Sequence, residues 1–138
     1  MSKVAVIYWS GIGNTEAMAG AVAEGAKDAG ADVDLLTCAD VSGVEIYDSV
    51  ALGCPAMGAE DFEDGEFLPM LEGIEPSLPG KKVALFGSYD WGDGEWLRSW
   101  EARCAEKGIA LATESVKCNN TPDDDGLAAC RALGAAIA

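Results

Sequence analysis

The chain has 138 residues, enough for one domain with a sizeable core, and 49% of them are hydrophobic, which argues against a disordered protein. Its 24 acidic and 9 basic residues give a formal net charge of −15, which makes nucleic acid and anionic membrane surfaces improbable partners. The charge suits docking against a basic patch on another protein, or it serves only to keep the protein in solution.

Strand and helix patterns alternate from one end of the chain to the other. In chain order, the pattern predicts a strand over residues 4–9, a helix over 15–29, a strand over 32–37, a helical turn over 44–47, a strand over 49–54, a helix over 66–74 that is bent or interrupted near Pro69, a strand over 83–87, a helix over 95–107, a strand over 109–117 and a helix over 126–137. Five strands that alternate with helices on short connections favour an α/β fold, with a parallel sheet covered by helices on both faces.

No repeat or linker interrupts this alternation, so we expect a single domain over residues 1–138. The apolar runs are no longer than strands, and no signal peptide precedes the first strand. We therefore expect a cytoplasmic protein.

The first strand leads into the segment Trp-Ser-Gly-Ile-Gly-Asn-Thr, residues 9–15, which opens a helix. The first amides of a helix have no intrahelical partner, and the helix dipole favours negative charge there. Gly11 and Gly13 allow a tight turn and a close approach of the backbone to a ligand, and Ser10 and Thr15 supply hydroxyl groups. The segment predicts a phosphate site, and the alternative is a well-capped helix start that binds no ligand.

Two common kinds of phosphate loop are excluded. The segment lacks the Lys-Ser/Thr pair of a Walker loop, and Glu16 stands where a dinucleotide-binding loop needs its third small residue. No basic residue occurs between Lys3 and Lys27. A phosphate here would be held by neutral amides and hydroxyls.

Two later loops follow strands whose carboxyl ends meet the same edge of the predicted sheet, where ligands of such folds bind. They cover residues 55–61 and 88–96, and each carries a large apolar side chain, Met57 and Trp91. Together these side chains could sandwich a flat aromatic ring, through sulfur–π contact on one side and stacking on the other. The alternative is that each covers its own end of the core.

The composition excludes most catalytic machinery. The chain has no histidine, which removes Ser-His and Cys-His nucleophiles and the usual metal ligands. Its five cysteines have no zinc or iron–sulfur spacing, and we interpret them as reduced packing residues: Cys38, Cys54, Cys104, Cys118 and Cys130. If this protein takes part in chemistry, a bound cofactor must carry it.

Three blocks carry a family resemblance. They read Tyr8-Trp9-Ser10-Gly11-x-Gly13-Asn14-Thr15-Glu16, Leu52-Gly53-Cys54-Pro55-Ala56-Met57-Gly58 and Lys81-Lys82-Val83-Ala84-Leu85-Phe86-Gly87-Ser88-Tyr89-x-Trp91-Gly92-Asp93-Gly94. Over its whole length the chain resembles the flavodoxins of the short-chain, clostridial type. The resemblance implies strand order 2-1-3-4-5, non-covalently bound FMN and one-electron transfer between redox partner proteins through the semiquinone/hydroquinone couple. It implies a carrier, expected to be a monomer, and not an enzyme.

The resemblance also implies the FMN site. The phosphate would be cradled by Ser10, Gly11, Ile12, Gly13, Asn14 and Thr15, with a hydroxyl from Ser88. The ring would be stacked on Trp91 and covered by Met57, within a site that includes Pro55, Ala56, Gly58, Ala59, Glu60, Tyr89, Asp90 and Gly92. Asn119 or Asn120 would reach the outer rim.

Three residues depart from the family pattern. Ile12 replaces a Thr, and the lost hydrogen bond to a charged group would weaken FMN binding by roughly 1.5–3 kcal/mol. Asp90 replaces a Gly, and Asp tolerates a positive φ better than most residues if the site needs one. Ala59 stands where Asp is frequent, next to the glycine whose peptide turns over on reduction in related proteins.

The loop after the third strand is rich in acids: Glu60, Asp61, Glu63, Asp64 and Glu66. A unit charge about 10 Å away in water acts with roughly 0.4 kcal/mol, less with salt. The cluster therefore predicts a low potential for the second reduction step. Two alternatives to a carrier are a small FMN-dependent reductase of quinones or nitro compounds and a scaffold that has lost its cofactor.

Overall fold

The structure, a computed structural model, describes residues 2–11, 13–57, 61 and 63–138. Its elements are β1 (Lys3–Tyr8), α1 (Asn14–Asp28), β2 (Asp32–Thr37), the 3₁₀ turn η1 (Cys38–Asp40), β3 (Ser49–Gly53), α2 (Phe67–Ile74), the 3₁₀ turn η2 (Glu75–Ser77), β4 (Lys82–Tyr89), α3 (Glu95–Glu106), β5 (Val116–Asn119) and α4 (Asp124–Ile137). The strands form one parallel sheet of order β2-β1-β3-β4-β5. The predicted fold class and strand order are confirmed.

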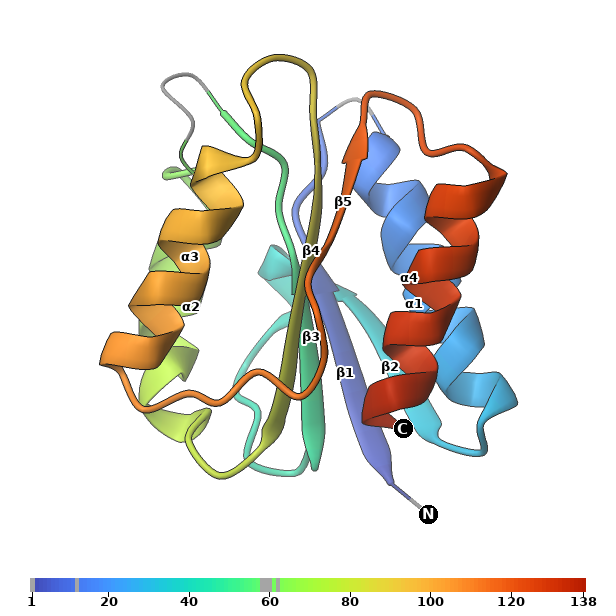
Figure 1. The fold of residues 1–138 in the computed structure, drawn as a ribbon. Helices are drawn as coiled ribbons and strands as arrows, with labels where there is room; N and C mark the ends of the chain where they lie inside the picture. Colours follow the sequence, from blue (N-terminus) through green and yellow to red (C-terminus); the bar gives the residue numbers. More distant parts are fainter. Residues whose placement is uncertain (1, 12, 58–60, 62) are drawn as a thin grey trace.

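Helices cover both faces of the sheet, with α1 and α4 on one face and α2 and α3 on the other (Figure 1). Alternation along β1 shows why. Val4 and Val6 pack in the core beneath α1 and α4, whereas Ala5 and Ile7 pack in the core beneath α2 and α3. A strand that is buried on both faces reads as the continuous apolar run seen in the sequence.

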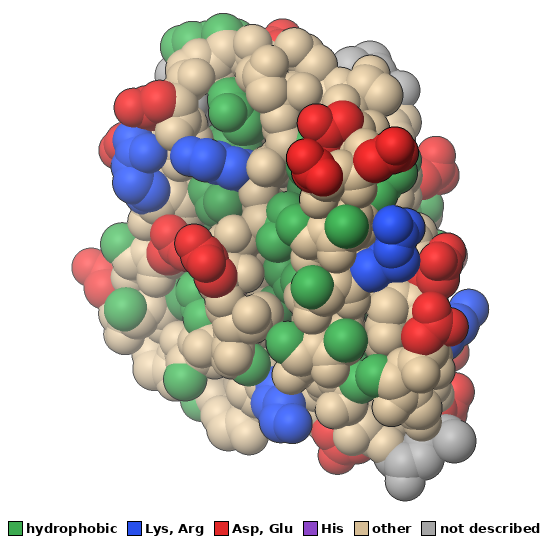
Figure 2. Space-filling view, turned by 45° about the vertical axis from the view of Figure 1, so that its right-hand side comes forward, with side chains coloured by type: hydrophobic (Ala, Val, Ile, Leu, Met, Phe, Trp, Pro, Cys, Tyr) green, Lys and Arg blue, Asp and Glu red, His purple; other side chains and the backbone are tan. Residues whose placement is uncertain are grey.

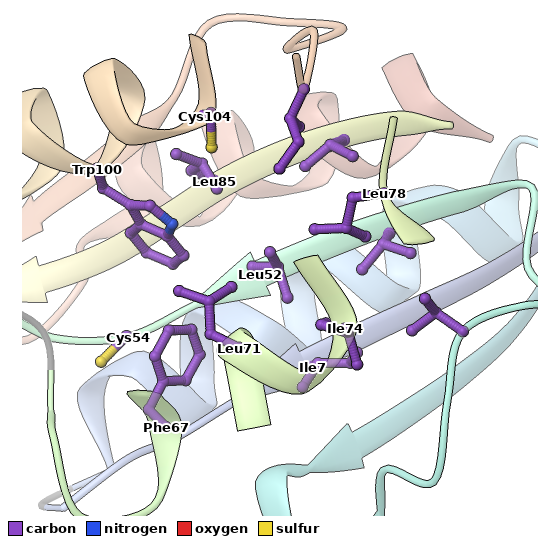
Figure 3. Close-up of a cluster of buried hydrophobic side chains, with 14 of the residues drawn as sticks. Ile7, Leu52, Cys54, Phe67, Leu71, Ile74, Leu78, Leu85, Trp100 and Cys104 are labelled. Atoms are coloured by element: carbon purple, nitrogen blue, oxygen red, sulfur yellow. The ribbon is translucent and has the colours of Figure 1, made fainter. Parts of the chain in front are cut away.

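The core beneath α2 and α3 is built around large side chains (Figure 3). Phe67 meets Trp100 edge to face, with ring centroids 5.3 Å apart and an interplanar angle of 82°. Trp96 and Trp100 lie on one face of α3, as predicted, and each is only 1% exposed. These contacts fix α2 and α3 against the sheet and so set the loops at the carboxyl ends of β3 and β4.

Glycines set the contact between α1 and α4 on the opposite face. A Cβ at Gly25 would collide with the backbone carbonyl of Arg131, and a Cβ at Gly134 would collide with the carbonyl of Val22. The two helix backbones therefore meet directly at these positions. Within the described stretches, no helix combines the length and the apolar character needed to cross a membrane.

The predicted strand over 109–117 is wrong over residues 109–115, because β5 begins only at Val116 and runs to Asn119. Leu111 forms an isolated bridge with Val83, and the ladder resumes with Val116 opposite Phe86. Between these two pairings lie four residues of this segment, 112–115, but only two residues of β4, 84–85. The extra residues bulge out of the sheet. In this bulge Ser115 donates a 2.8 Å hydrogen bond to Glu101 of α3, so a partner outside the sheet holds it.

Smaller differences concern element ends. α2 runs through Pro69 without interruption, since a proline in the first turn removes no hydrogen bond that the helix needs. The predicted helical turn over 44–47 is a single turn, in which the N–H of Tyr47 donates to the carbonyl of Val44. α4 begins earlier than predicted, because Asp123 caps it by accepting a 2.7 Å hydrogen bond from the N–H of Gly126.

Candidate functional site

The segment between β1 and α1 forms a capped helix start. Gly13 has a φ of 99°, in the left-handed region that favours glycine. The hydroxyl of Ser10 accepts hydrogen bonds from the N–H groups of Gly13, at 3.1 Å, and of Glu16, at 3.2 Å. The first-turn amides of Asn14 and Thr15 have no intrahelical acceptor, because a helix cannot supply one there. These two N–H groups can therefore donate hydrogen bonds to an anion.

A buried hydroxyl pair joins this helix start to the sheet. The hydroxyls of Thr15 and Ser88 lie 2.8 Å apart, and the two residues are 1% and 5% exposed. Ser88 belongs to the end of β4, so residues 73 positions apart in the chain meet beneath the loop. The sequence prediction that the loops after β1 and β4 share one edge of the sheet is confirmed, as Figure 1 also shows.

The segment after β3 is tied to the same edge. The N–H of Ala56 donates to the carbonyl of Ser88 at 2.9 Å. Met57 and Asp61 exchange two backbone hydrogen bonds of 2.7 and 3.1 Å, which close a tight loop. The predictions for Gly58, Ala59 and Glu60 inside this loop fall outside the described residues, as does the prediction for Ile12.

The segment after β4 is anchored at its base. The guanidinium of Arg98 donates to the carboxylate of Asp93 at 2.9 Å, and the ammonium of Lys117 donates to the Asp93 carbonyl at 3.0 Å. Gly92 and Gly94 both have positive φ, of 83° and 96°. Asp90 has no positive φ, so its tolerance of that conformation is not used here.

The three segments meet at one cleft of about 210 Å³. Its lining residues are Trp9, Gly11, Asn14, Pro55, Ala56, Met57, Ser88, Tyr89, Asp90 and Asn120. Eight predicted site residues are therefore brought together here: Gly11, Asn14, Pro55, Ala56, Met57, Ser88, Tyr89 and Asp90. None of the described lining residues is Lys or Arg, so the cleft offers neutral donors and one carboxylate.

Other predicted residues lie near the cleft without lining it. Ser10 and Gly13 line a neighbouring hollow of about 430 Å³, and Thr15 is buried beneath the loop. Trp91 is 58% exposed and, with Gly92, is not among the lining residues. Stacking of a ring on Trp91 therefore stays a prediction.

Two lining residues were not assigned a firm place by the sequence. Asn120 adopts a left-handed φ of 57°, and its N–H donates to the carbonyl of Tyr89 at 2.7 Å. A polar turn after the last strand is the only signal for it, and the choice between Asn119 and Asn120 was open. Trp9 belongs to the first block of the family resemblance and follows β1 directly, but the sequence alone indicates no role for it.

One acid of the loop after β3 has a structural task, and three of the cysteines are buried or partly buried thiols. The carboxylate of Glu63 folds back onto α2 and accepts three backbone hydrogen bonds of 2.7 Å, so it serves as a helix cap. Burial raises the pKa of Cys38 and Cys104 to about 11 and that of Cys130 to about 12. These thiols are protonated at neutral pH, which agrees with their interpretation as packing residues.

The donor set fits a ligand with a single phosphate. Backbone amides at the start of α1 and the hydroxyl of Ser88, which is backed by the buried hydroxyl of Thr15, are neutral donors, and Met57, 38% exposed, offers an apolar surface beside them. Nothing in the described lining would neutralise a second phosphate. The cleft therefore suits an apolar group that carries one phosphate.

Known proteins resemble this chain over nearly its whole length. The family model described as Flavodoxin matches residues 6–134. The chain is similar to the flavodoxin of Megasphaera elsdenii, with 44% identity over 137 residues that cover 98% of each chain, and to that of Clostridium beijerinckii, with 45% identity over 121 residues that cover 86% of this chain and 88% of the other. The solution structure of the two-electron reduced Megasphaera elsdenii flavodoxin superposes with a TM-score of 0.88, at 42% identity and 97% coverage of each chain.

Proposed function

The chain belongs to the flavodoxin family, and from that premise we infer that it is an FMN-binding electron carrier. The observation that carries this function in the structure is the convergence of the segments after β1, β3 and β4 on one cleft. FMN supplies the redox chemistry when it is bound. The polypeptide binds and orients FMN, and the FMN-loaded protein passes electrons to and from partner proteins.

We propose that the residues predicted from the sequence form the FMN site. The amides at the start of α1, together with the hydroxyls of Ser10, Thr15 and Ser88, would hold the phosphate. Their support is the capped helix start and the buried hydroxyl pair. Met57 and Trp91 would cover the two faces of the ring. Both are exposed apolar side chains on loops at this edge of the sheet, which supports the assignment.

A low potential for the second reduction step is part of the proposal. Asp90 lines the cleft and Asp61 lies on the loop beside it, while the lining has no described cation. Negative charge near the ring disfavours adding another, so the doubly reduced protein would be a strong electron donor.

The remaining parts of the proposal concern the whole chain. Residues 1–138 would act as one FMN-binding unit, as a monomer in the cytoplasm. The net charge of −15 favours partners with basic docking patches. A weak reductase activity of the bound flavin is the alternative, and the chain offers no insertion for a second nucleotide.

Titration of the apoprotein with FMN tests the function. We expect quenching of flavin fluorescence with a stoichiometry of one, and much weaker binding of riboflavin, which lacks the phosphate. The holoprotein should oxidise NADH and NADPH only slowly in the presence of a quinone. Absence of FMN binding would contradict the carrier, and rapid turnover with a nicotinamide donor would favour the reductase.

A further inference from the structure

Trp9 lines two neighbouring hollows at the start of α1. It lines the cleft together with Asn14 and Met57, and it also lines the neighbouring hollow of about 430 Å³, which reaches Cys38. Its backbone is fixed, since the N–H of Trp9 donates to the carbonyl of Gly53 at 3.0 Å. The side chain is partly buried and packs against the core beneath α2 and α3. Trp9 therefore lies, with Gly11, at the boundary of the two hollows.

Both edges of the indole have a defined neighbour. The Nε1–H donates a 3.2 Å hydrogen bond to Oε1 of Glu66, in the turn before α2. At the opposite edge, Cη2 and Cζ3 lie so close to Gly11 that a Cβ there would be 3.3 and 3.5 Å from them. Glu66 thus sets the orientation of the ring, and the missing side chain of Gly11 lets the ring lie against the loop.

We propose that Trp9 is a cofactor-contacting residue that forms the wall of the cleft at its phosphate end, and that Glu66 is the positioning residue that holds it there. The inference rests on the FMN binding proposed above. Trp9 lines the cleft and also the second hollow, which holds the carboxylates of Glu66 and Glu16, so its ring adds an apolar surface on the side of the cleft that faces these charges. By keeping water and these charges away, it strengthens hydrogen bonds to the phosphate.

The role predicts selectivity between two flavins. A wall at the phosphate end helps FMN and gives little to riboflavin, which has the same ring without the phosphate. Loss of the wall should therefore reduce the ratio of the FMN and riboflavin affinities. A purely structural role of Trp9 would lower both affinities together and leave the ratio unchanged.

Fluorescence titrations of the apoproteins with each flavin test this. Trp9→Leu should bind FMN about tenfold more weakly and riboflavin less than about twofold more weakly. Trp9→Phe keeps an aromatic wall without the N–H, so its ratio of FMN to riboflavin affinity should lie between those of the unaltered protein and Trp9→Leu. Thermal unfolding serves as the control that both variants are folded. An unchanged affinity ratio in Trp9→Leu overturns the proposal. If the unaltered protein binds no FMN, the proposed function itself fails.

A second pair of variants isolates the hydrogen bond. Glu66→Gln and Glu66→Leu both remove the charge, but only Gln keeps an acceptor for the indole. Glu66→Leu should bind FMN about threefold more weakly than Glu66→Gln, while riboflavin binds both alike. Equal FMN affinity in the two variants would contradict the positioning role of Glu66.

Discussion

Glu63 shows how one side chain in an acid-rich loop acquires a task that its neighbours lack. Partial burial acts to raise the pKa of its carboxyl, but hydrogen bonds from the N–H groups of Phe67, Glu66 and Gly65 outweigh it and leave that pKa below its ordinary value. The sequence placed Glu63 among charges that tune a potential. The carboxylate is instead committed to the turn that leads into α2, where it accepts from the first helical amide, that of Phe67, and from the two amides before it.

Replacing Glu63 should expose this task. Glu63→Gln should lower the free energy of unfolding at neutral pH by about 1 kcal/mol, as for other lost caps. Because the folded pKa is depressed, the stabilisation is complete above the unfolded value of about 4.3 and is lost as the pH falls through the folded pKa. Urea unfolding at pH 7 and at pH 3 should thus show a gap between Glu63→Gln and the unaltered protein that narrows in acid.

The control for this variant is Asp64→Asn, at the exposed neighbour in the same turn. It should change stability by no more than about 0.5 kcal/mol. A gap for Glu63→Gln that stays constant between the two pH values, or an equal effect of Asp64→Asn, would contradict the capping role.

At the scale of elements, periodicity predicted the helices and most strands because the same apolar patterns that mark an element also bury it. β2 begins and ends where the pattern predicts, at Asp32 and Thr37. The segment over 109–115 was assigned wrongly, since its bulge depends on Ser115 reaching Glu101 across the fold. The close contact between α1 and α4 could not be predicted either. A glycine within a helix lowers helix propensity, and its role in helix packing is visible only when the partner helix is placed.

That approach yields a prediction for two glycines of α1. Gly25→Ala should destabilise the protein by about 1–3 kcal/mol, because the new methyl meets the backbone of α4 at Arg131. Gly20→Ala, in the same helix with open space around it, should stabilise the protein by about 0.5–1 kcal/mol. Urea unfolding of both variants checks this. Stabilisation by both would mean that the two helices are not in contact at Gly25.

The capped helix start proposed to hold the phosphate could be predicted from local sequence, because a strand end, glycines and hydroxyls in one short segment suffice to form it. The ring end could not be placed as fully. Met57 lies on the cleft as expected, but Trp91 is on an exposed loop whose conformation is set only at its base, through Asp93. Trp9 has no local signal for its role, since its contacts with Glu66 and Gly11 appear only in three dimensions.

Considered as a whole, the molecule presents a strongly acidic surface. Figure 2 shows acidic side chains spread over one face, with basic ones between them. Within the described part of the cleft lining, Asp90 is the one charged residue. Under the proposed function, the field of the molecule would oppose negative charge on a bound ring and would favour partners with basic surfaces.

Neutralising single acidic side chains should shift the potential of the bound flavin by an amount that depends on their distance from it. Asp90→Asn should raise the potential of the second one-electron step of the bound FMN by about 10–20 mV, as expected for a charge roughly 10 Å away in water. Asp28→Asn, at the far end of α1, removes the same charge and should leave that potential nearly unchanged. Equal shifts in the two variants would show that net charge, and not its position, sets the potential.

The most direct test is stepwise reduction of the FMN-loaded protein, followed by its absorbance spectrum. The account predicts one FMN per chain and two separate one-electron steps. A blue, long-wavelength species should accumulate after the first, and the second should lie at a lower potential than in free FMN. A protein that retains no FMN, or one that takes up both electrons in a single step, would contradict it.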